Sequence, residues 1–203
     1  MLLDFNEIYH KYNLNIKGVI HIGAHFGQEH RFYVEKQIKN IIYFEPLSNN
    51  YNRLVENVGT SAKTYKMALG NEKKEIDMFV ESNNMGMSSS ILKPKHHLIQ
   101  YPHITFDKTE KVLMDRLDNV DFDRESFNFI NIDVQGYELE VFKGSVGTLE
   151  NIDYIISEIN NTDLYENGAM IQDLCDFLGK FGFVLVEQNW VGQTWGDGFF
   201  IKK

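Results

Sequence analysis

Cysteine is nearly absent from this chain of 203 residues, which contains only Cys175. A single cysteine excludes an internal disulfide framework and fits a reducing compartment. Cys175 lies between Leu174 and Leu178 on an apolar helix face, so we interpret it as a packed core thiol. Long apolar runs are absent too, and the N-terminus lacks a basic region followed by an apolar core. We therefore expect a cytoplasmic protein that has no membrane partner.

Positive charge is scarce as well. The chain has 20 Lys and Arg residues against 29 Asp and Glu residues, its net charge is −9, and its basic residues form no block. This balance argues against nucleic acid as the main partner. His96, His97 and His103 match no closed zinc pattern, so we expect no metal site. The length suits one α/β domain that spans residues 1–203, and no pattern indicates an oligomeric state.

A dinucleotide-binding fingerprint needs glycines at the first, third and sixth positions of its turn, and the middle one is missing here. Residues 18–29 predict a buried strand, a glycine turn with Gly23 and Gly27, and the start of a helix. His25 takes the place of the middle glycine, so we do not expect a pyrophosphate pressed against the backbone. Glycines still let the backbone approach a ligand, and a helix N-terminus offers free N–H groups. The turn therefore fits a nucleoside that carries a smaller tail.

An acidic residue follows at the place that a ribose needs. Residues 39–44 predict a second strand, which ends at Glu45 and Pro46, about 20 positions past the turn. A carboxylate at the end of such a strand accepts hydrogen bonds from both hydroxyls of a ribose diol. The alternative is a solvated carboxylate at a strand end, although Pro46 leaves Glu45 less free than that.

The rest of the chain alternates strands with helices, which predicts parallel pairing and right-handed crossovers. We expect an amphipathic helix at 4–12, and we expect Ser48 to cap the helix after the second strand. Residues 81–110 show no regular spacing of apolar residues and hold two of the three prolines, which predicts an irregular, lid-like insertion. The predicted strands are 17–22, 41–44, 62–68, 75–80, 111–117, 128–133 and 153–159, followed by a hairpin of 183–187 and 198–201 whose loop holds Trp190 and Trp195.

Five motifs, taken in order, resemble those of the FkbM family of S-adenosylmethionine-dependent methyltransferases. They are residues 21–27, 44–46, 68–70, 88–92 and 131–144, and the resemblance spans roughly residues 17–190. It implies an α/β, class I methyltransferase (Rossmann-like) fold, with a mostly parallel seven-stranded sheet, helices on both faces and an antiparallel C-terminal hairpin. It also implies S-adenosyl-L-methionine as cofactor and O-methylation of a hydroxyl on a sugar, glycan or related small molecule.

Two positions depart from the family's pattern. The family often has an acidic residue where this chain has His21, and it often has Glu where this chain has Gln135. His21 removes a carboxylate that would hold the cofactor's amino group, and Gln135 removes a charge beside Asp133. The cofactor assignment survives both changes, whereas the catalytic assignment is weakened.

The resemblance also implies which residues contact the cofactor. The glycine turn would pass close to the methionine part, Glu45 would take the ribose hydroxyls, and residues 67–69 would lie beside the adenine ring or serve as plain core. An empty turn in a Rossmann-like domain is the alternative. The expected cofactor-binding residues are His21, Gly23, Ala24, His25, Gly27, Glu45, Pro46, Ala68, Leu69, Ser89 and Asp133.

Two carboxylates are the candidate catalytic residues. Asp133 ends the predicted central strand at the edge where α/β sheets bind ligands, and its candidate roles are to hold the cofactor's amino group, to orient the acceptor hydroxyl or to take its proton. Capping the helix that starts near Gly136 is its structural alternative. Glu158 lies near the end of the next strand and is either a second candidate base or a surface carboxylate.

Two other functions stay open at this point. A methyltransferase fold that binds its nucleoside without turnover is motivated by His21 and Gln135. A nicotinamide-dependent oxidoreductase is disfavoured by His25 in the turn and by the absence of a Tyr-x-x-x-Lys pair on a helix. Trp190 and Trp195 would either stack on a sugar face or cover the sheet edge. No pattern identifies the small-molecule or glycan acceptor.

Overall fold

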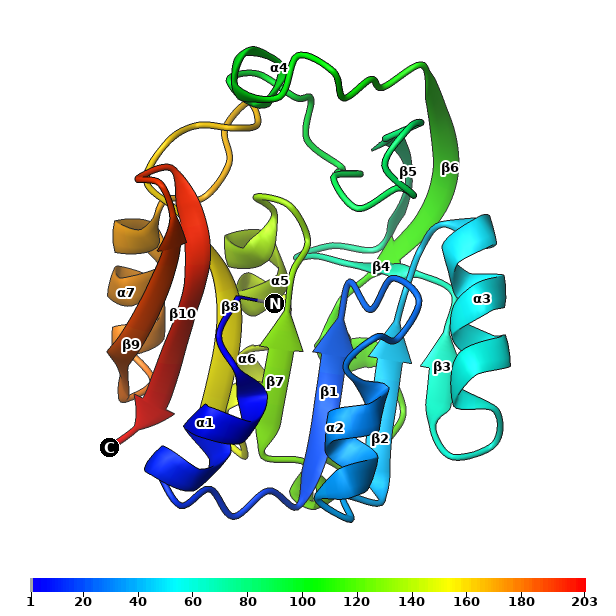
Figure 1. Cartoon of the computed structure of the whole chain (residues 1–203). Helices are drawn as coiled ribbons and strands as arrows, with labels where there is room; N and C mark the ends of the chain where they lie inside the picture. Colours follow the sequence, from blue (N-terminus) through cyan, green and yellow to red (C-terminus); the bar gives the residue numbers. More distant parts are fainter. Residues whose placement is uncertain (1) are drawn as a thin grey trace.

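The computed structural model describes residues 2–203, and its main feature is a sheet of seven strands (Figure 1). The strand order is β3-β2-β1-β7-β8-β10-β9, and β10 alone runs antiparallel to its neighbours. The predicted fold class is therefore confirmed. The strands are β1 (Gly18–Ile22), β2 (Asn40–Phe44), β3 (Lys63–Tyr65), β7 (Phe129–Ile132), β8 (Tyr154–Asn160), β9 (Phe183–Val191) and β10 (Trp195–Lys202).

Helices cover both faces of this sheet. In Figure 1, α1 and α2 lie in front of it, and α5 and α6 lie behind it. Asp4 caps α1 by accepting hydrogen bonds from the backbone N–H groups of Asn6 and Glu7. Within residues 2–203, no helix has the length and apolar character that crossing a membrane requires. The helices are α1 (Phe5–Lys11), α2 (His30–Glu35), α3 (Ser48–Val58), α4 (His97–Gln100), α5 (Glu138–Lys143), α6 (Val146–Leu149) and α7 (Ile171–Gly179), with 3-10 turns at Leu117–Asn119 and Arg124–Ser126.

Two apolar cores pack against opposite faces of the sheet. Side chains alternate between the faces along a strand, so Ile20 and Ile22 of β1 join one core and Val19 joins the other. Phe5 and Ile8 of α1 complete the second core. All of β1 is buried, as expected for a central parallel strand covered on both faces. The cores hold the carboxyl ends of β1, β2, β7 and β8 at one edge.

A second sheet of three strands stands beside the first, in the order β4-β6-β5. Its strands are β4 (Ala68–Leu69), β5 (Lys74–Val80) and β6 (Lys108–Asp115). The predicted single strand at 62–68 is therefore wrong: β3 ends at Tyr65, and Ala68 and Leu69 pair with β6 instead. This departure brings Ala68 and Leu69 to the carboxyl end of β2, where they line a cavity with Glu45.

Two further local predictions are wrong. Ser48 does not cap α3, because Leu47 is the N-cap residue and the Ser48 hydroxyl donates to Glu110 at 2.5 Å. Trp190 and Trp195 do not lie in the hairpin loop, because β9 and β10 extend to residues 191 and 195. The two indoles are therefore held by strand pairing, which fixes their positions relative to β8.

Residues 81–107 form an irregular segment, which we call the cover segment; it lies above the carboxyl edge, with α4 at the top of Figure 1. The regular strand β6 resumes at Lys108, two residues before the predicted end of the insertion. The Glu81 side chain is buried and accepts hydrogen bonds from the backbone N–H groups of Asn83, Asn84 and Gly86. One buried carboxylate thus organises the first turn of the cover segment.

Candidate active site

Two adjoining cavities open along the carboxyl edge of the parallel strands, where α/β sheets bind ligands. The larger has a volume of about 460 Å³ and the smaller about 50 Å³. Both are lined by Gly23, His25, Met87, Asp133 and Gln135, so the two spaces meet at these residues. The larger cavity is in the range of small-molecule sites, whereas the smaller one has room for only a few waters.

The structure brings most of the expected cofactor residues to these two cavities. His21 and Ala24 line the larger cavity. Those on the smaller cavity are Gly23, His25, Glu45, Pro46, Ala68, Leu69, Ser89 and Asp133. Gly27 is the exception: a side chain there would place its Cβ 2.8 Å from Leu54 and 3.2 Å from Val58. Gly27 therefore packs the turn against α3 and lines neither cavity, and a cofactor contact there stays a prediction.

The glycine turn packs closely against the backbone at the end of β7. Gly23 has a φ of 75°, and a Cβ there would lie 1.8 Å from the carbonyl oxygen of Asp133. Only glycine allows this approach between the ends of β1 and β7. His25 also has a positive φ, and its Nε2 donates to the carbonyl of Met85 at 2.8 Å while its Nδ1 accepts from Gln28 at 2.6 Å. His25 thereby ties the turn to the cover segment.

Glu45 is buried at the end of β2, with 4% of its surface exposed. Its Oε2 accepts from the backbone N–H of His25 and its Oε1 from that of Leu47, both at 2.9 Å. Burial nevertheless raises the pKa of Glu45 to about 8, because desolvation outweighs these two hydrogen bonds. Each carboxylate oxygen keeps a second lone pair, so Glu45 retains capacity to accept ligand hydroxyls.

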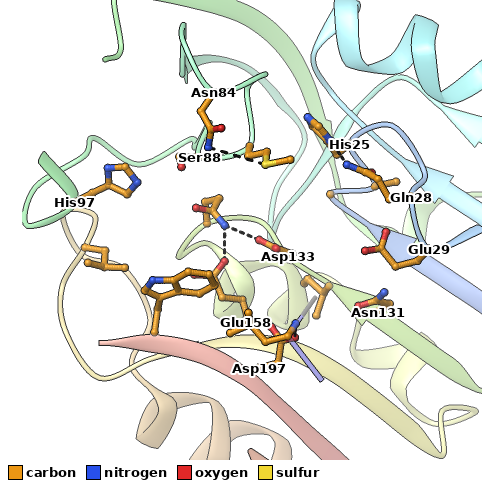
Figure 2. A pocket seen from close by; sticks show the side chains of 18 of the residues that line it. His25, Gln28, Glu29, Asn84, Ser88, His97, Asn131, Asp133, Glu158 and Asp197 are labelled. Atoms are coloured by element: carbon orange, nitrogen blue, oxygen red, sulfur yellow. Dashed lines mark hydrogen bonds between the residues drawn. The ribbon is translucent and has the colours of Figure 1, made fainter. Parts of the chain in front are cut away.

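Asp133, Gln135 and Glu158 form one hydrogen-bonded cluster where the cavities meet (Figure 2). The side-chain amide of Gln135 donates to Asp133 at 2.6 Å and to Glu158 at 2.5 Å. The Gln135 carbonyl accepts at 2.8 Å from the hydroxyl of Tyr165, which also lies 2.8 Å from the carbonyl of Ser88. Gln135 itself has a φ of 55°, a conformation that costs energy in a residue other than glycine. An amide therefore stands between two carboxyl groups and links them to the cover segment.

The structural alternatives for the two carboxylates are both wrong. Helix α5 begins at Glu138 with Tyr137 as its N-cap residue, so Asp133 does not cap it. Glu158 is not a surface carboxylate, because only 2% of it is exposed. Burial and the charges of Asp133 and Glu138 raise the pKa of Glu158 well above its ordinary value.

Glu138 supports the turn that carries Gln135. Its Oε1 accepts from the backbone N–H groups of Val134 and Gly136, at 3.0 and 3.2 Å. Burial raises the pKa of Glu138 to about 7, with the charge of Asp133 adding to the effect. Sequence reasoning did not give Glu138 or Gln135 this structural role, although both lie in the most specific motif.

His21 is buried at the wall of the larger cavity, where it takes part in a chain of polar side chains. Asn131 donates to the hydroxyl of Tyr33 at 2.8 Å, and that hydroxyl is hydrogen-bonded to Nδ1 of His21 at 3.2 Å. Burial lowers the pKa of His21, which is therefore neutral. A neutral imidazole does not replace the carboxylate that the family often has here, and it supplies a polar wall to the larger cavity.

Among residues 2–203, no group of His, Cys, Asp and Glu side chains is arranged to hold a metal ion. His96 pairs with Asp163, and the carbonyl of His103 accepts from Asn83. His97, which has no periodic pattern around it in the sequence, instead lines the larger cavity together with Trp195.

Sequence comparison gives two matches. The Methyltransferase FkbM domain matches residues 21–185, which is more than half of the chain. The 2-O-methyltransferase NoeI of Sinorhizobium fredii is 30% identical over 177 residues, covering 82% of this chain and 72% of that protein.

Solved structures share the fold. The 1,6-didemethyltoxoflavin-N1-methyltransferase of Burkholderia thailandensis, determined with bound S-adenosylhomocysteine, superposes with a TM-score of 0.52 at 11% identity, covering 97% of this chain and 75% of that one. The methyltransferase domain of bacterial CtHen1-C superposes with a TM-score of 0.55 at 10% identity, covering 97% and 95% of the two chains. At such identities the likeness concerns the fold alone.

Proposed function

Because this chain belongs to the FkbM family of S-adenosylmethionine-dependent methyltransferases, we propose that it O-methylates a hydroxyl of a sugar, glycan or related small molecule. The cluster of Asp133, Gln135 and Glu158 carries this proposal, since the Asp133 carboxyl group lies where the two cavities meet and is available as a candidate proton acceptor. The relative named as a 2-O-methyltransferase supports a hydroxyl acceptor. Family membership removes the nicotinamide-dependent oxidoreductase from consideration.

The smaller cavity has the chemistry of an adenosine site. Glu45 would accept the ribose hydroxyls, and Ala68 and Leu69 would pack on the adenine. Its volume of about 50 Å³ does not admit a nucleoside. Met87 and Ser89 of the cover segment line it, so this part of the segment has to move aside for the cofactor to enter.

The methionine end would lie along the glycine turn, toward the larger cavity. Gly23, Ala24 and His25 line that cavity, and Asp133 is shared by both. The cofactor supplies an activated methyl group on a sulfonium. The chain has to align the acceptor with that group, exclude water and remove one proton.

Asp133 is the residue that we assign to the proton. It lines both cavities, and the Gln135 amide orients its carboxylate at 2.6 Å. The raised pKa of Glu158 favours its protonated form, in which it cannot accept a proton. The same amide also donates to Glu158 at 2.5 Å, so Gln135 links the two carboxyl groups. We therefore assign Glu158 to positioning, and Asp133 to general-base catalysis.

The test is to incubate the protein with S-adenosylmethionine and a panel of glycosides and to measure S-adenosylhomocysteine. Asp133→Asn should lower turnover by about 100-fold or more, which is the usual contribution of a general base. Asp176→Asn, on the solvent side of α7, is the matched control and should keep wild-type turnover. Equal turnover in the Asp133 variant would remove this residue from catalysis.

A binding module without turnover is the second candidate, and the neutral His21 favours it. The two functions differ in one outcome. A module binds S-adenosylhomocysteine in calorimetry yet forms none from any acceptor, whereas the enzyme does both.

A further inference from the structure

The end of the larger cavity away from the glycine turn is built from aromatic side chains. Trp195 lies on β10, and its indole N–H donates to the hydroxyl of Tyr101 at 2.7 Å. Tyr101 follows α4, and its hydroxyl also accepts from Gln100 at 2.9 Å. The indole is thus fixed both by strand pairing and by a hydrogen bond from its edge. A fixed ring in a cavity wall offers a flat apolar surface at little entropic cost.

Strand register relates Trp195 to the catalytic cluster. Asp197 of β10 lies opposite Glu158 of β8, and Trp195 lies opposite Asn160. Trp195 is two residues from Asp197, so its side chain leaves the same face of the sheet about 7 Å further along the strand. A six-membered ring resting on this indole would therefore reach toward Asp133 and Glu158, which line the same cavity.

His97 contributes a polar atom that has no partner. It is 97% buried, with 3% of its surface exposed, and its Nδ1 forms no hydrogen bond within residues 2–203. Aromatic rings of Tyr101, Phe106 and Tyr165 surround the imidazole at centroid distances of 5.1 to 5.6 Å. Figure 2 shows His97 pointing into the cavity from the side opposite Asn131. A buried polar atom without a partner is uncommon. Nδ1 itself has almost no accessible surface, so a small rotation of the imidazole is needed before a ligand hydroxyl can satisfy it.

The charged side chains that line the larger cavity restrict which acceptors it can bind. Asp133, Glu158 and Asp197 line the larger cavity, and no Lys or Arg is among its described lining residues. An anionic acceptor would meet carboxyl groups without any cation to balance it, in a space where screening is weak. A hydroxyl group both donates and accepts, so it suits carboxylates and a neutral imidazole equally.

We propose that Trp195, His97 and Tyr101 form an acceptor subsite that binds an uncharged sugar ring. The apolar face of the ring lies on the indole, one hydroxyl bonds to Nδ1 of His97, and the hydroxyl to be methylated faces Asp133. This inference rests on the proposed O-methyltransferase function and names its acceptor class. It also separates the two tryptophans: Trp195 lines the cavity, whereas Trp190 packs on the core of the sheet.

Binding is tested with the protein's own fluorescence. The chain has two tryptophans, so Trp190→Phe leaves Trp195 as the single indole. This variant, loaded with S-adenosylhomocysteine, is titrated with the methyl glycosides of glucose, galactose and N-acetylglucosamine, and with glucose 6-phosphate and glucuronate. We expect a saturable change in Trp195 emission with at least one uncharged glycoside and none with the two anions. A response to the anions alone, or to no glycoside, would overturn the subsite.

Transfer assays use variants that keep the shape of the wall. His97→Phe retains the ring but not Nδ1, and Trp195→Leu retains apolar bulk but not the flat face. Each should raise the acceptor KM about tenfold, the usual effect of losing one good contact. The dissociation constant of S-adenosylhomocysteine should stay within about twofold, and Trp195→Phe should recover part of the loss. Trp190→Phe is the matched control with wild-type kinetics.

The outcomes separate the two proposals. If transfer occurs but these variants keep the wild-type acceptor KM, the subsite is wrong and the methyltransferase proposal stands. If glycosides change Trp195 emission while no S-adenosylhomocysteine forms, the subsite stands and the enzymatic proposal fails. Transfer to 1,2-dihydroxybenzene alone would show that the indole receives an aromatic acceptor and would overturn the sugar assignment. A variant that loses its thermal transition is replaced by Tyr101→Phe, which frees the indole N–H and should also raise the acceptor KM.

Discussion

Glu45→Gln tests whether the buried acid at the end of β2 is what the cofactor binds. Burial raises the pKa of Glu45 from 4.5 to about 8. Between these two values the folded chain keeps a proton that the unfolded chain releases. Stability therefore falls as pH rises through this window, by about 1.4 kcal/mol per pH unit from this group alone. From about pH 5 to pH 7 the loss amounts to roughly 3 kcal/mol.

Glu45→Gln removes the change of stability with pH that Glu45 causes. Gln is neutral at every pH, so the variant lacks the Glu45 part of the dependence and keeps that of Glu138, Glu158 and Asp197, whose pKa values are also raised by burial. Gln has one acceptor oxygen for the two backbone N–H groups that Glu45 now satisfies, which costs roughly 1–3 kcal/mol at every pH. The informative quantity is therefore how the difference in unfolding free energy between variant and wild type changes with pH. The value of that difference at a single pH is not informative.

Urea unfolding of both proteins from about pH 5 to pH 8 measures this difference. The stability of the variant relative to wild type should rise with pH by about 1.4 kcal/mol per unit. In calorimetry, the variant should bind S-adenosylhomocysteine about 10- to 100-fold more weakly at pH 8, because a charge-assisted hydrogen bond to the ribose is lost. Wild-type affinity should increase toward pH 8 as Glu45 ionises, and that of the variant should be flat. Parallel stability curves together with unchanged affinity would refute both the burial argument and the ribose assignment.

Three other substitutions address the cluster and the cover segment. Gln135→Glu places a third carboxyl group between Asp133 and Glu158. Turnover at neutral pH should fall about tenfold or more, and the pH profile of kcat should move to higher pH. An unmoved profile would contradict the positioning role of Gln135. Glu158→Gln substitutes a neutral group for one whose raised pKa favours the protonated form, so we expect kcat within about threefold of wild type, with a gain in stability that grows with pH. A loss near 100-fold would identify Glu158 as the base. His25→Ala removes the hydrogen bond to the Met85 carbonyl. The backbone amides of residues 84–88 should then exchange with deuterium at least about tenfold faster. Unchanged exchange would show that His25 does not hold the cover segment.

The pattern of apolar residues was enough to predict the central strands, because these strands are buried on both faces and therefore consist of short apolar runs. The same pattern could not show that the chain leaves the main sheet between Tyr65 and Ala68, since a strand that changes sheets keeps its apolar residues. Ser48 was assigned to the wrong position of α3 for a comparable reason. Its hydroxyl is used by Glu110, which is 62 residues away in sequence.

The sequence predicted where a candidate residue lies when that residue directly follows a parallel strand. Glu45 and Asp133 follow parallel strands directly, so both reach the carboxyl edge. Gly27 lines neither cavity, because a turn glycine serves packing as readily as ligand contact. His97 and Tyr165 lie in irregular segments, where no period indicates which way a side chain points. Their contribution to the larger cavity and the cluster depends on contacts that only the folded chain reveals.

A crystal structure of the protein with S-adenosylhomocysteine tests the central claim most directly. The predicted result is an adenosine between Glu45 and Leu69, with both ribose hydroxyls on the Glu45 carboxylate, the sulfur facing Asp133, and Met87 and Ser89 displaced from their present positions. Trp195 and His97 should remain free for an acceptor. A nucleoside bound against Trp195, with Met87 and Ser89 still closing the smaller cavity, would contradict the account.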